Sequence, residues 1–226
     1  MVMEFFKGRG ASQVERIEEQ IGEMLAICET TFEMAASALL GEADVAQIGQ
    51  TLRKRDRNVN RTERAIRQEL VVHAAVRGSA VEAPLILTYM SIAKDIERIG
   101  DYAKNIWDVA SASHHSFATL PEADAFREHA ARTTELIAKT AVIFRDRQTA
   151  EATETLSEVD GWLDEYDAIV EGQLDGDRPS REGVPIALVY RYVKRITAHC
   201  MNVLTSLVMP LDRIDFWDEA KADRWN

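Results

Sequence analysis

The chain has 226 residues, of which 38 are acidic and 27 basic, so its formal net charge is −11. Only 11 glycines and 5 prolines interrupt a sequence rich in Ala, Leu, Ile, Glu and Arg. This composition favours long helices and argues against a turn-rich β-sandwich. The acidic balance repels nucleic acid at long range, so we expect no nucleic-acid partner.

The two cysteines, Cys28 and Cys200, lie within apolar helical patterns. A disulfide framework needs more cysteines and a secretory context, so we expect buried free thiols in a reducing compartment. There is no run of about 18 apolar residues, the length that a membrane-spanning helix needs. The first residues also lack the apolar centre of a signal peptide. These features together predict a cytoplasmic protein.

Apolar residues recur at steps of three and four in six segments, as they do on the buried face of a helix. The first segment covers 17–39 and ends at Gly41. The second follows Asp44, a candidate N-cap, and continues to Gly78. The third begins near Pro84, a residue that suits the first turn of a helix, and continues to residue 110.

Three more segments with the same spacing follow Pro121 and cover 126–144, 152–170 and 189–207. We expect a turn-rich connection over 175–185, because glycines and prolines cluster there. Pro210 ends the last segment. The closing stretch 211–226 is too short to assign to an element.

The second half of the chain repeats the first. The apolar positions 92, 96, 99, 103, 106 and 110 become 189, 193, 196, 200, 203 and 207 on adding 97, which accounts for the whole apolar face of the sixth segment. The shift is 104 between the second and fifth segments, and about 109 between the first and fourth. The sequence therefore predicts an all-α protein with an internal duplication, built as two tandem three-helix bundles over residues 1–117 and 118–226.

One group of carboxylates stands apart from the general surface charge. Glu97 and Asp101 are four residues apart, so both lie on one face of the third helix. The second helix adds Asp56, Asn60 and Glu63 beside its apolar face. Oxygen ligands in cysteine-free surroundings suit Mg²⁺, Ca²⁺, Mn²⁺ or iron better than zinc. The commoner interpretation of such spacing is a solvated face paired with nearby arginines.

Other chemistries find less support in the sequence. A ferritin-like di-iron centre needs Glu-x-x-His motifs on two core helices, but Glu69 and His73 are four apart and no second pair faces inward. There is no Gly-rich phosphate loop and no nucleophile motif. The remaining histidines are interpreted as ordinary surface or boundary residues: His114, His115, His129 and His199. We therefore expect no enzyme activity.

The run Asp95-Ile-Glu-Arg-Ile-Gly-Asp-Tyr-Ala-Lys-Asn-Ile106 resembles the signature of the PhoU family, the regulators of bacterial phosphate uptake. In that family a Glu/Asp-x-x-x-Asp motif followed by Asn lies on the third helix of a duplicated three-helix unit. The resemblance extends in architecture and length over nearly the whole chain. It implies a non-catalytic adaptor between a phosphate ABC transporter and a sensor histidine kinase, associated with the membrane only through these partners. It also implies a homodimer.

The resemblance further implies a bound divalent or multinuclear metal: iron, magnesium, manganese or zinc. Glu97 and Asp101 match the family motif, and Asp56 is the expected contribution of the second helix. Further candidates are Asn60, Glu63 and Asn105. In the second half Lys194 and Ala198 replace the two acidic positions of the motif, so we expect one metal site at most, in the first unit.

Two other functions remain open on these residues alone. One is a metal-storage or metal-dependent hydrolytic protein unconnected with phosphate signalling. The other is a helical scaffold whose acidic face is only solvated.

Overall fold

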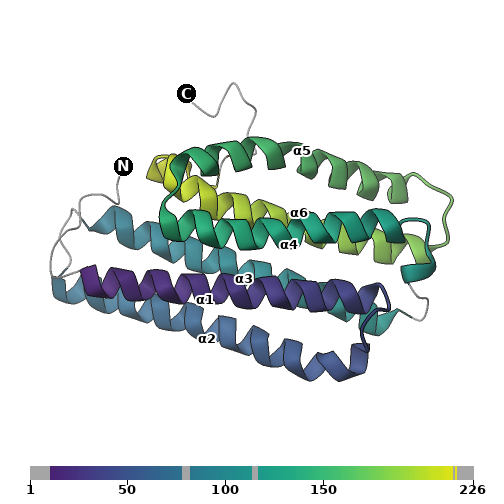
Figure 1. Ribbon diagram of the computed structural model, residues 1–226, viewed down its shortest axis with the longest axis horizontal. Helices are drawn as coiled ribbons and strands as arrows, with labels where there is room; N and C mark the ends of the chain where they lie inside the picture. The colour runs from purple at the N-terminus through teal and green to yellow at the C-terminus, as the bar shows by residue number, and fades with distance from the viewer. Residues whose placement is uncertain (1–10, 78–81, 114–116, 216, 218–226) are drawn as a thin grey trace.

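The computed structural model describes residues 11–77, 82–113, 117–215 and 217. Within these ranges the chain forms six long helices without a strand (Figure 1). They are α1 (Ala11–Leu39), α2 (Val45–Arg77), α3 (Ala83–Ala112), α4 (Ala123–Asp146), α5 (Thr149–Leu174) and α6 (Ser180–Val208). Two short 3₁₀ helices are η2 (Phe117–Thr119) and η3 (Leu211–Arg213). His114, His115 and residues 218–226 lie outside the described residues.

The helix ends follow the local signals that predicted them. Gly41 takes a φ of 72°, a left-handed conformation that glycine adopts without strain, just after α1 ends. The Asp44 carboxylate accepts hydrogen bonds from the amides of Ala46 (2.8 Å) and Gln47 (3.0 Å), which confirms it as the N-cap of α2. Pro84 lies in the first turn of α3, where a missing amide costs nothing.

The predicted connection over 175–185 is wrong in its second half, because α6 already begins at Ser180. Pro185 lies inside that helix. As the sixth residue of α6 it has no amide to donate to the Arg181 carbonyl, which costs the helix one backbone hydrogen bond in its second turn. The cluster of glycines and prolines predicts a break up to residue 185, whereas α6 accommodates Gly183 and Pro185 within its first two turns.

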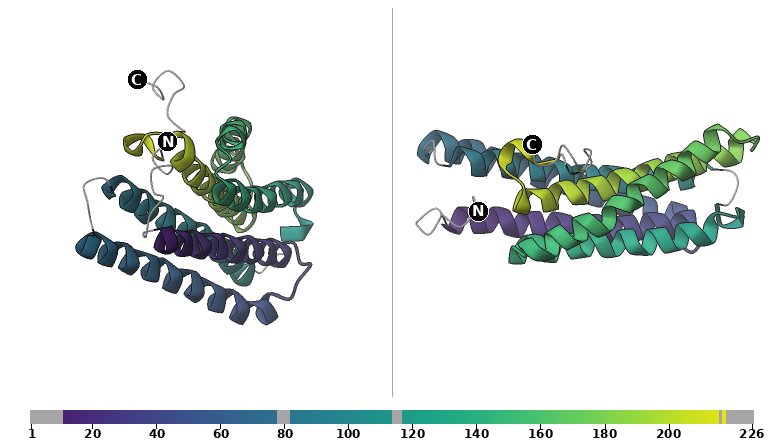
Figure 2. Two further views of the ribbon diagram at one scale, coloured as in Figure 1. Left: turned by 60° about the vertical axis from the view of Figure 1, so that its left-hand side comes forward. Right: turned by 90° about the horizontal axis from the view of Figure 1, so that it is seen from above.

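The six helices form a four-helix centre with one helix on each outer side. In the centre α1 packs against α3 and α4, and α6 packs against α3 and α4. The helix α2 covers α1 and α3 on one side, while α5 covers α6 on the other (Figures 1 and 2). The corresponding helices of the two halves, α1 with α4 and α3 with α6, thus meet at the interface between them.

The core is formed by the apolar positions that the spacing predicted. From Leu85 to Ile106 the predicted face of α3 is buried, and Val189 to Val203 of α6 are buried likewise. The division between residues 117 and 118 stays a prediction. It falls inside η2, and Phe117 packs edge-on against Phe126 of α4, with ring centroids 5.2 Å apart.

Both cysteines are free and fully buried, as predicted. Burial raises the pKa of Cys200 to about 12 and also raises that of Cys28. These thiols therefore stay protonated and unreactive at neutral pH. None of the described helices is long and apolar enough to cross a membrane.

Gly49 marks a close approach between α2 and α3. The Trp107 indole donates a hydrogen bond to the Val45 carbonyl over 2.9 Å, which lays the ring against the first turns of α2. A Cβ atom at Gly49 would lie 2.5 Å from Trp107 Cζ2. The ring is rigid and held by its hydrogen bond, so the clash could be relieved only by moving the helices apart.

We therefore expect Gly49→Ala to lower the free energy of unfolding by about 1–3 kcal/mol, as for other overpacked sites. Gly161 of α5 has nothing within 4 Å of such a Cβ, so Gly161→Ala serves as the matched control. It should gain about 0.5–1 kcal/mol from helix propensity alone. Urea unfolding measures both, and a Gly49→Ala protein as stable as wild type would contradict the packing described here.

Candidate functional site

The predicted candidate residues lie on two neighbouring helices. Glu97, Asp101 and Asn105 follow one another along α3, and all three are half-buried. The helix α2, which packs against α3, carries Asp56, Asn60 and Glu63.

Three of the carboxylates are close enough to repel one another. Burial raises the pKa of Asp101, and the charges of Glu97 and Asp56 raise it further, against the opposing effect of Lys104. Burial also raises the pKa of Asp56, and Glu97 adds to this while Lys104 opposes it. Asp56, Glu97 and Asp101 therefore form one electrostatically coupled acidic cluster between α2 and α3.

Cations of the protein occupy part of the predicted set. Lys94 Nζ lies 2.5 Å from Glu97 Oε2, three residues along the same helix. Glu63 is buried and paired at 2.8 Å with Arg67, one turn along α2. Glu97 and Glu63 are thus each paired with a cation of their own helix.

The donor chemistry of the acidic cluster fits a hard divalent cation, because such ions prefer carboxylate oxygen. The positions of the side chains do not form a ligand set, however. Among the described residues, no three His, Cys, Asp or Glu side chains lie together in a way that could hold a metal ion. Metal binding by the six candidate residues therefore stays a prediction, and a metal ion would have to displace Lys94 from Glu97.

The corresponding place in the second half holds a protein cation instead of an acidic motif. Lys194, at the position that matches Glu97, forms an ion pair with Asp167 of α5. Arg191 approaches the same carboxylate at 3.4 Å. Ala198 replaces the second acidic residue of the motif. Ion pairs therefore link α5 to α6 at the place where α2 and α3 carry carboxylates that repel one another.

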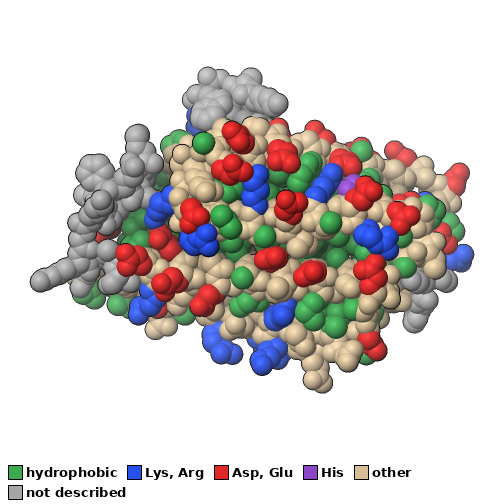
Figure 3. Space-filling view, in the orientation of Figure 1, with side chains coloured by type: hydrophobic (Ala, Val, Ile, Leu, Met, Phe, Trp, Pro, Cys, Tyr) green, Lys and Arg blue, Asp and Glu red, His purple; other side chains and the backbone are tan. Residues whose placement is uncertain are grey.

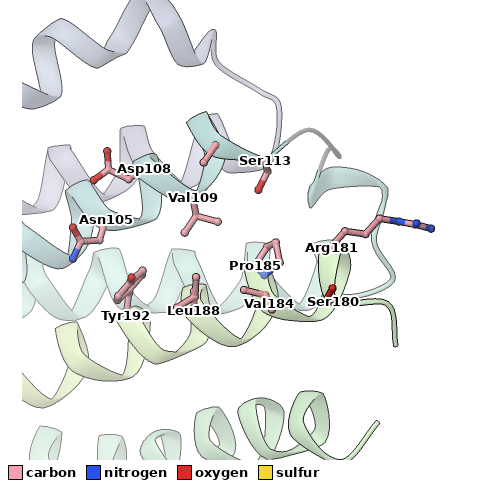
Figure 4. A pocket seen from close by; sticks show the side chains of 11 residues that line it. Asn105, Asp108, Val109, Ser113, Ser180, Arg181, Val184, Pro185, Leu188 and Tyr192 are labelled. Carbon is pink, nitrogen blue, oxygen red and sulfur yellow. The ribbon is translucent and has the colours of Figure 1, made fainter. Parts of the chain in front are cut away.

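A hollow of about 710 Å³ opens beside Asn105, between the end of α3 and the start of α6 (Figure 4). Asn105, Asp108 and Tyr192 lie at one end, and the Arg181 side chain extends away from the hollow at the other. Its α6 wall includes Val184 and Leu188, two of the more exposed apolar side chains. The hollow thus includes the candidate residue Asn105 in its lining. Its walls come from both halves of the chain, α3 on one side and α6 on the other.

A polar contact that the sequence does not predict joins the two halves. Asp95 is buried, and its Oδ1 lies 2.7 Å from His199 Nδ1 and accepts a hydrogen bond from Asn202 over 3.0 Å. Tyr102 stacks on the His199 ring with centroids 5.8 Å apart. His199 is half-buried and thus a boundary residue, as predicted, but its hydrogen bond to Asp95 was not expected from the spacing.

A second polar cluster that the sequence does not predict lies inside the second half. His129 is buried, with Nδ1 3.0 Å from the Tyr190 hydroxyl and Nε2 3.0 Å from Glu165 Oε1. Arg132 lies 2.5 Å from Glu165 and donates a hydrogen bond to the Tyr166 hydroxyl. The interpretation of His129 as a surface or boundary residue is therefore wrong.

Spacing could have found both buried residues. Asp95 lies three residues after Ile92 and four before Ile99, and His129 lies three after Phe126 and four before Thr133. Each therefore belongs to the face of its helix that the apolar pattern buries. A buried polar group needs a hydrogen-bond partner, so its position alone predicts a polar contact across helices.

Comparison with known proteins finds a family match in the first half of the chain. The family model described as the PhoU domain matches residues 21–110. The fold is similar to that of PhoU from Pseudomonas aeruginosa, with a TM-score of 0.76 and 21% identity over 90% of this chain and 99% of that one. It is also similar to the phosphate transport system regulatory protein PhoU from Streptococcus pneumoniae, with a TM-score of 0.71 and 19% identity over 90% and 97%. No curated protein matches the sequence.

The buried histidine should make folding sensitive to pH. Burial lowers the pKa of His129 below its usual value of about 6.5, Arg132 lowers it further, and Glu165 opposes both. Protonation therefore favours the unfolded chain, so this contribution to stability is complete above about pH 6.5 and is lost as the pH falls through the lowered pKa. The slope is at most about 1.4 kcal/mol per pH unit for one proton.

We expect His129→Gln, which cannot titrate, to flatten the free energy of unfolding against pH between about pH 7 and 5. Thr134→Ala on the same helix removes a local hydrogen bond to the Ala130 carbonyl and should keep the slope of the wild type. Urea unfolding across this pH range measures all three proteins. The same slope for His129→Gln and wild type would exclude His129 as the titrating group.

Proposed function

We propose that this protein regulates phosphate uptake and phosphate-starvation signalling, because residues 21–110 match the PhoU domain model. The observation that supports this most is the match of the domain model to the segment with the acidic cluster on α3. The likeness in fold to two PhoU proteins over nine tenths of the chain supports it further.

In this role the protein acts in the cytoplasm as an adaptor without catalysis of its own. It contacts components of a phosphate ABC transporter and a sensor histidine kinase, and it restrains the starvation response when phosphate is plentiful. A helical bundle suits such a role, because its exposed helix faces offer rigid surfaces to partners. The homodimer stays a prediction.

Deleting the gene should raise the output of a phosphate-starvation reporter in phosphate-rich medium, and expressing the wild-type chain should restore the low output. Affinity purification of the tagged chain from phosphate-replete cells should recover the transporter or the kinase. Unchanged reporter output together with no such partner would overturn the proposal. Turnover of a phosphate ester by the purified protein would favour the hydrolytic alternative instead.

We also propose that the acidic cluster of Asp56, Glu97 and Asp101 binds a divalent cation. The repulsion that raises the pKa values of Asp56 and Asp101 supports this, since a bound cation would relieve it. Asn60, Glu63 and Asn105 are proposed as flanking residues.

Asp101→Asn should therefore raise the free energy of unfolding in metal-free buffer by about 0.2–0.5 kcal/mol, because it removes the like charge four residues from Glu97. Added Mn²⁺ at 100 times its Kd should stabilise the wild type by about 2.7 kcal/mol and Asp101→Asn much less. Asp164→Asn is the control, because Asp164 is exposed on α5, and Mn²⁺ should stabilise this variant as much as the wild type. Equal stabilisation of Asp101→Asn and wild type by Mn²⁺ would place any cation site elsewhere.

A further inference from the structure

The two outer helices carry opposite charge. The helix α2 has eight Lys or Arg and three Asp or Glu, whereas α5, its counterpart in the second half, has eight Asp or Glu and no Lys or Arg. The two helices lie on opposite sides of the molecule (Figure 1). In the space-filling view, Lys and Arg side chains gather along the lower edge, over α2 (Figure 3). The net charge of −11 thus hides a localised basic face.

This basic face contains a hollow of about 350 Å³ between α1 and α2. Ile27 of α1 contributes an apolar wall, and α2 contributes Lys54, Arg55 and Arg61. Two further residues complete the lining, Thr51 and Asn58, both with side chains that can donate a hydrogen bond. Three cationic groups and two neutral donors therefore surround one small space that has no carboxylate in its lining.

The cations of the hollow lack partners within the part of the chain that the structure describes. No carboxylate there lies within ion-pair distance of Lys54, Arg55 or Arg61, whereas Arg67 on the same helix pairs with Glu63 at 2.8 Å. Arg55 Nη1 is buried and makes no hydrogen bond. A buried donor without an acceptor is unfavourable, so an acceptor supplied from outside the chain would stabilise this arrangement.

Repulsion between the cations of the basic face also indicates that an anion from outside the chain would stabilise it. Arg57 and Arg61 are four residues apart on α2, where two like charges destabilise a helix unless an opposite charge offsets them. A second hollow beside the first is lined by Arg53, Lys54 and Arg57, with Gln50 and Thr51. Lys54 borders both hollows and extends the positive charge along the helix.

We propose that the hollow lined by Lys54, Arg55 and Arg61 binds a phosphoryl-type oxyanion. A guanidinium group offers parallel N–H donors that match two oxygens of such an anion, and the ammonium group of Lys54 adds a point charge. A space of about 350 Å³ has room for inorganic phosphate or for the phosphate of one lipid headgroup. This site is separate from the acidic cluster, which lies toward α3, and it goes beyond the proposed regulatory function.

To test this, the purified full chain is titrated with inorganic phosphate at constant ionic strength, and the heat of binding is measured by calorimetry. Arg55→Gln and Arg61→Gln should each weaken binding about tenfold, as expected for the loss of one charge-assisted hydrogen bond. Arg64→Gln removes the same charge from the same helix outside the hollow and should bind as the wild type does. Arg61 is exposed, so its variant remains informative even if Arg55→Gln unfolds.

A second experiment distinguishes free inorganic phosphate from the phosphate of a lipid headgroup as the ligand. Vesicles of phosphatidylglycerol are compared with vesicles of phosphatidylcholine, using the same four proteins. Binding of free phosphate that depends on Arg55 and Arg61 supports the site with the free ion as its ligand. Binding to phosphatidylglycerol alone with the same dependence supports it with the lipid headgroup as its ligand.

The absence of both kinds of binding, or binding that Arg55→Gln and Arg61→Gln leave unchanged, would overturn the proposal. Binding weakened equally by Arg64→Gln would reduce it to the general attraction of a basic helix and would overturn it too. These measurements use the isolated protein, whereas the regulatory function is tested by reporter output in cells. Failure of one is therefore distinguishable from failure of the other.

Discussion

The contact between α3 and α6 is the constraint on which the rest of the structure depends. Each helix presents its apolar face to the other half of the chain, and Asp95 lies buried among these residues. A buried carboxylate is stable only with polar partners, and His199 and Asn202 of α6 provide them. The first half therefore buries Asp95 favourably only when the second half is present, which makes the two units interdependent in stability.

The largest difference in charge between the two halves lies on their outer helices, since α2 carries eight Lys or Arg and α5 carries none. The helices α1, α3, α4 and α6 face other helices on several sides, so a charge on them needs a partner, as Lys194 of α6 has in Asp167. The helices α2 and α5 cover the centre from outside and keep an exposed face. Their opposite charges give the molecule an acidic side and a basic side without disturbing the core. The acidic cluster arises where α2 meets α3, at the boundary between these two kinds of helix.

Much of the fold could be predicted because apolar spacing and local signals act within one helix. The steps of three and four fixed the buried face of α3, and Asp44 marked the start of α2 through its own hydrogen bonds. The start of α6 differs from the prediction because Gly183 and Pro185, which are unfavourable inside a helix, lie within its first two turns. For the candidate site, the spacing placed Glu97 and Asp101 together, but it could not show that Lys94 and Arg67 hold Glu97 and Glu63.

The sequence by itself determined the six helices, their duplication and the buried face of each, because these depend on periodicity along one chain segment. Only the tertiary structure decided which helices meet and which polar groups share an interface. Asp95 and His199 are 104 positions apart, and no local pattern links them. The same holds for the hollow beside Arg55, where Ile27 of α1 closes one side. The burial of a side chain and the identity of its hydrogen-bond partner both depend on contacts between helices. They are therefore decided only when the helices pack together.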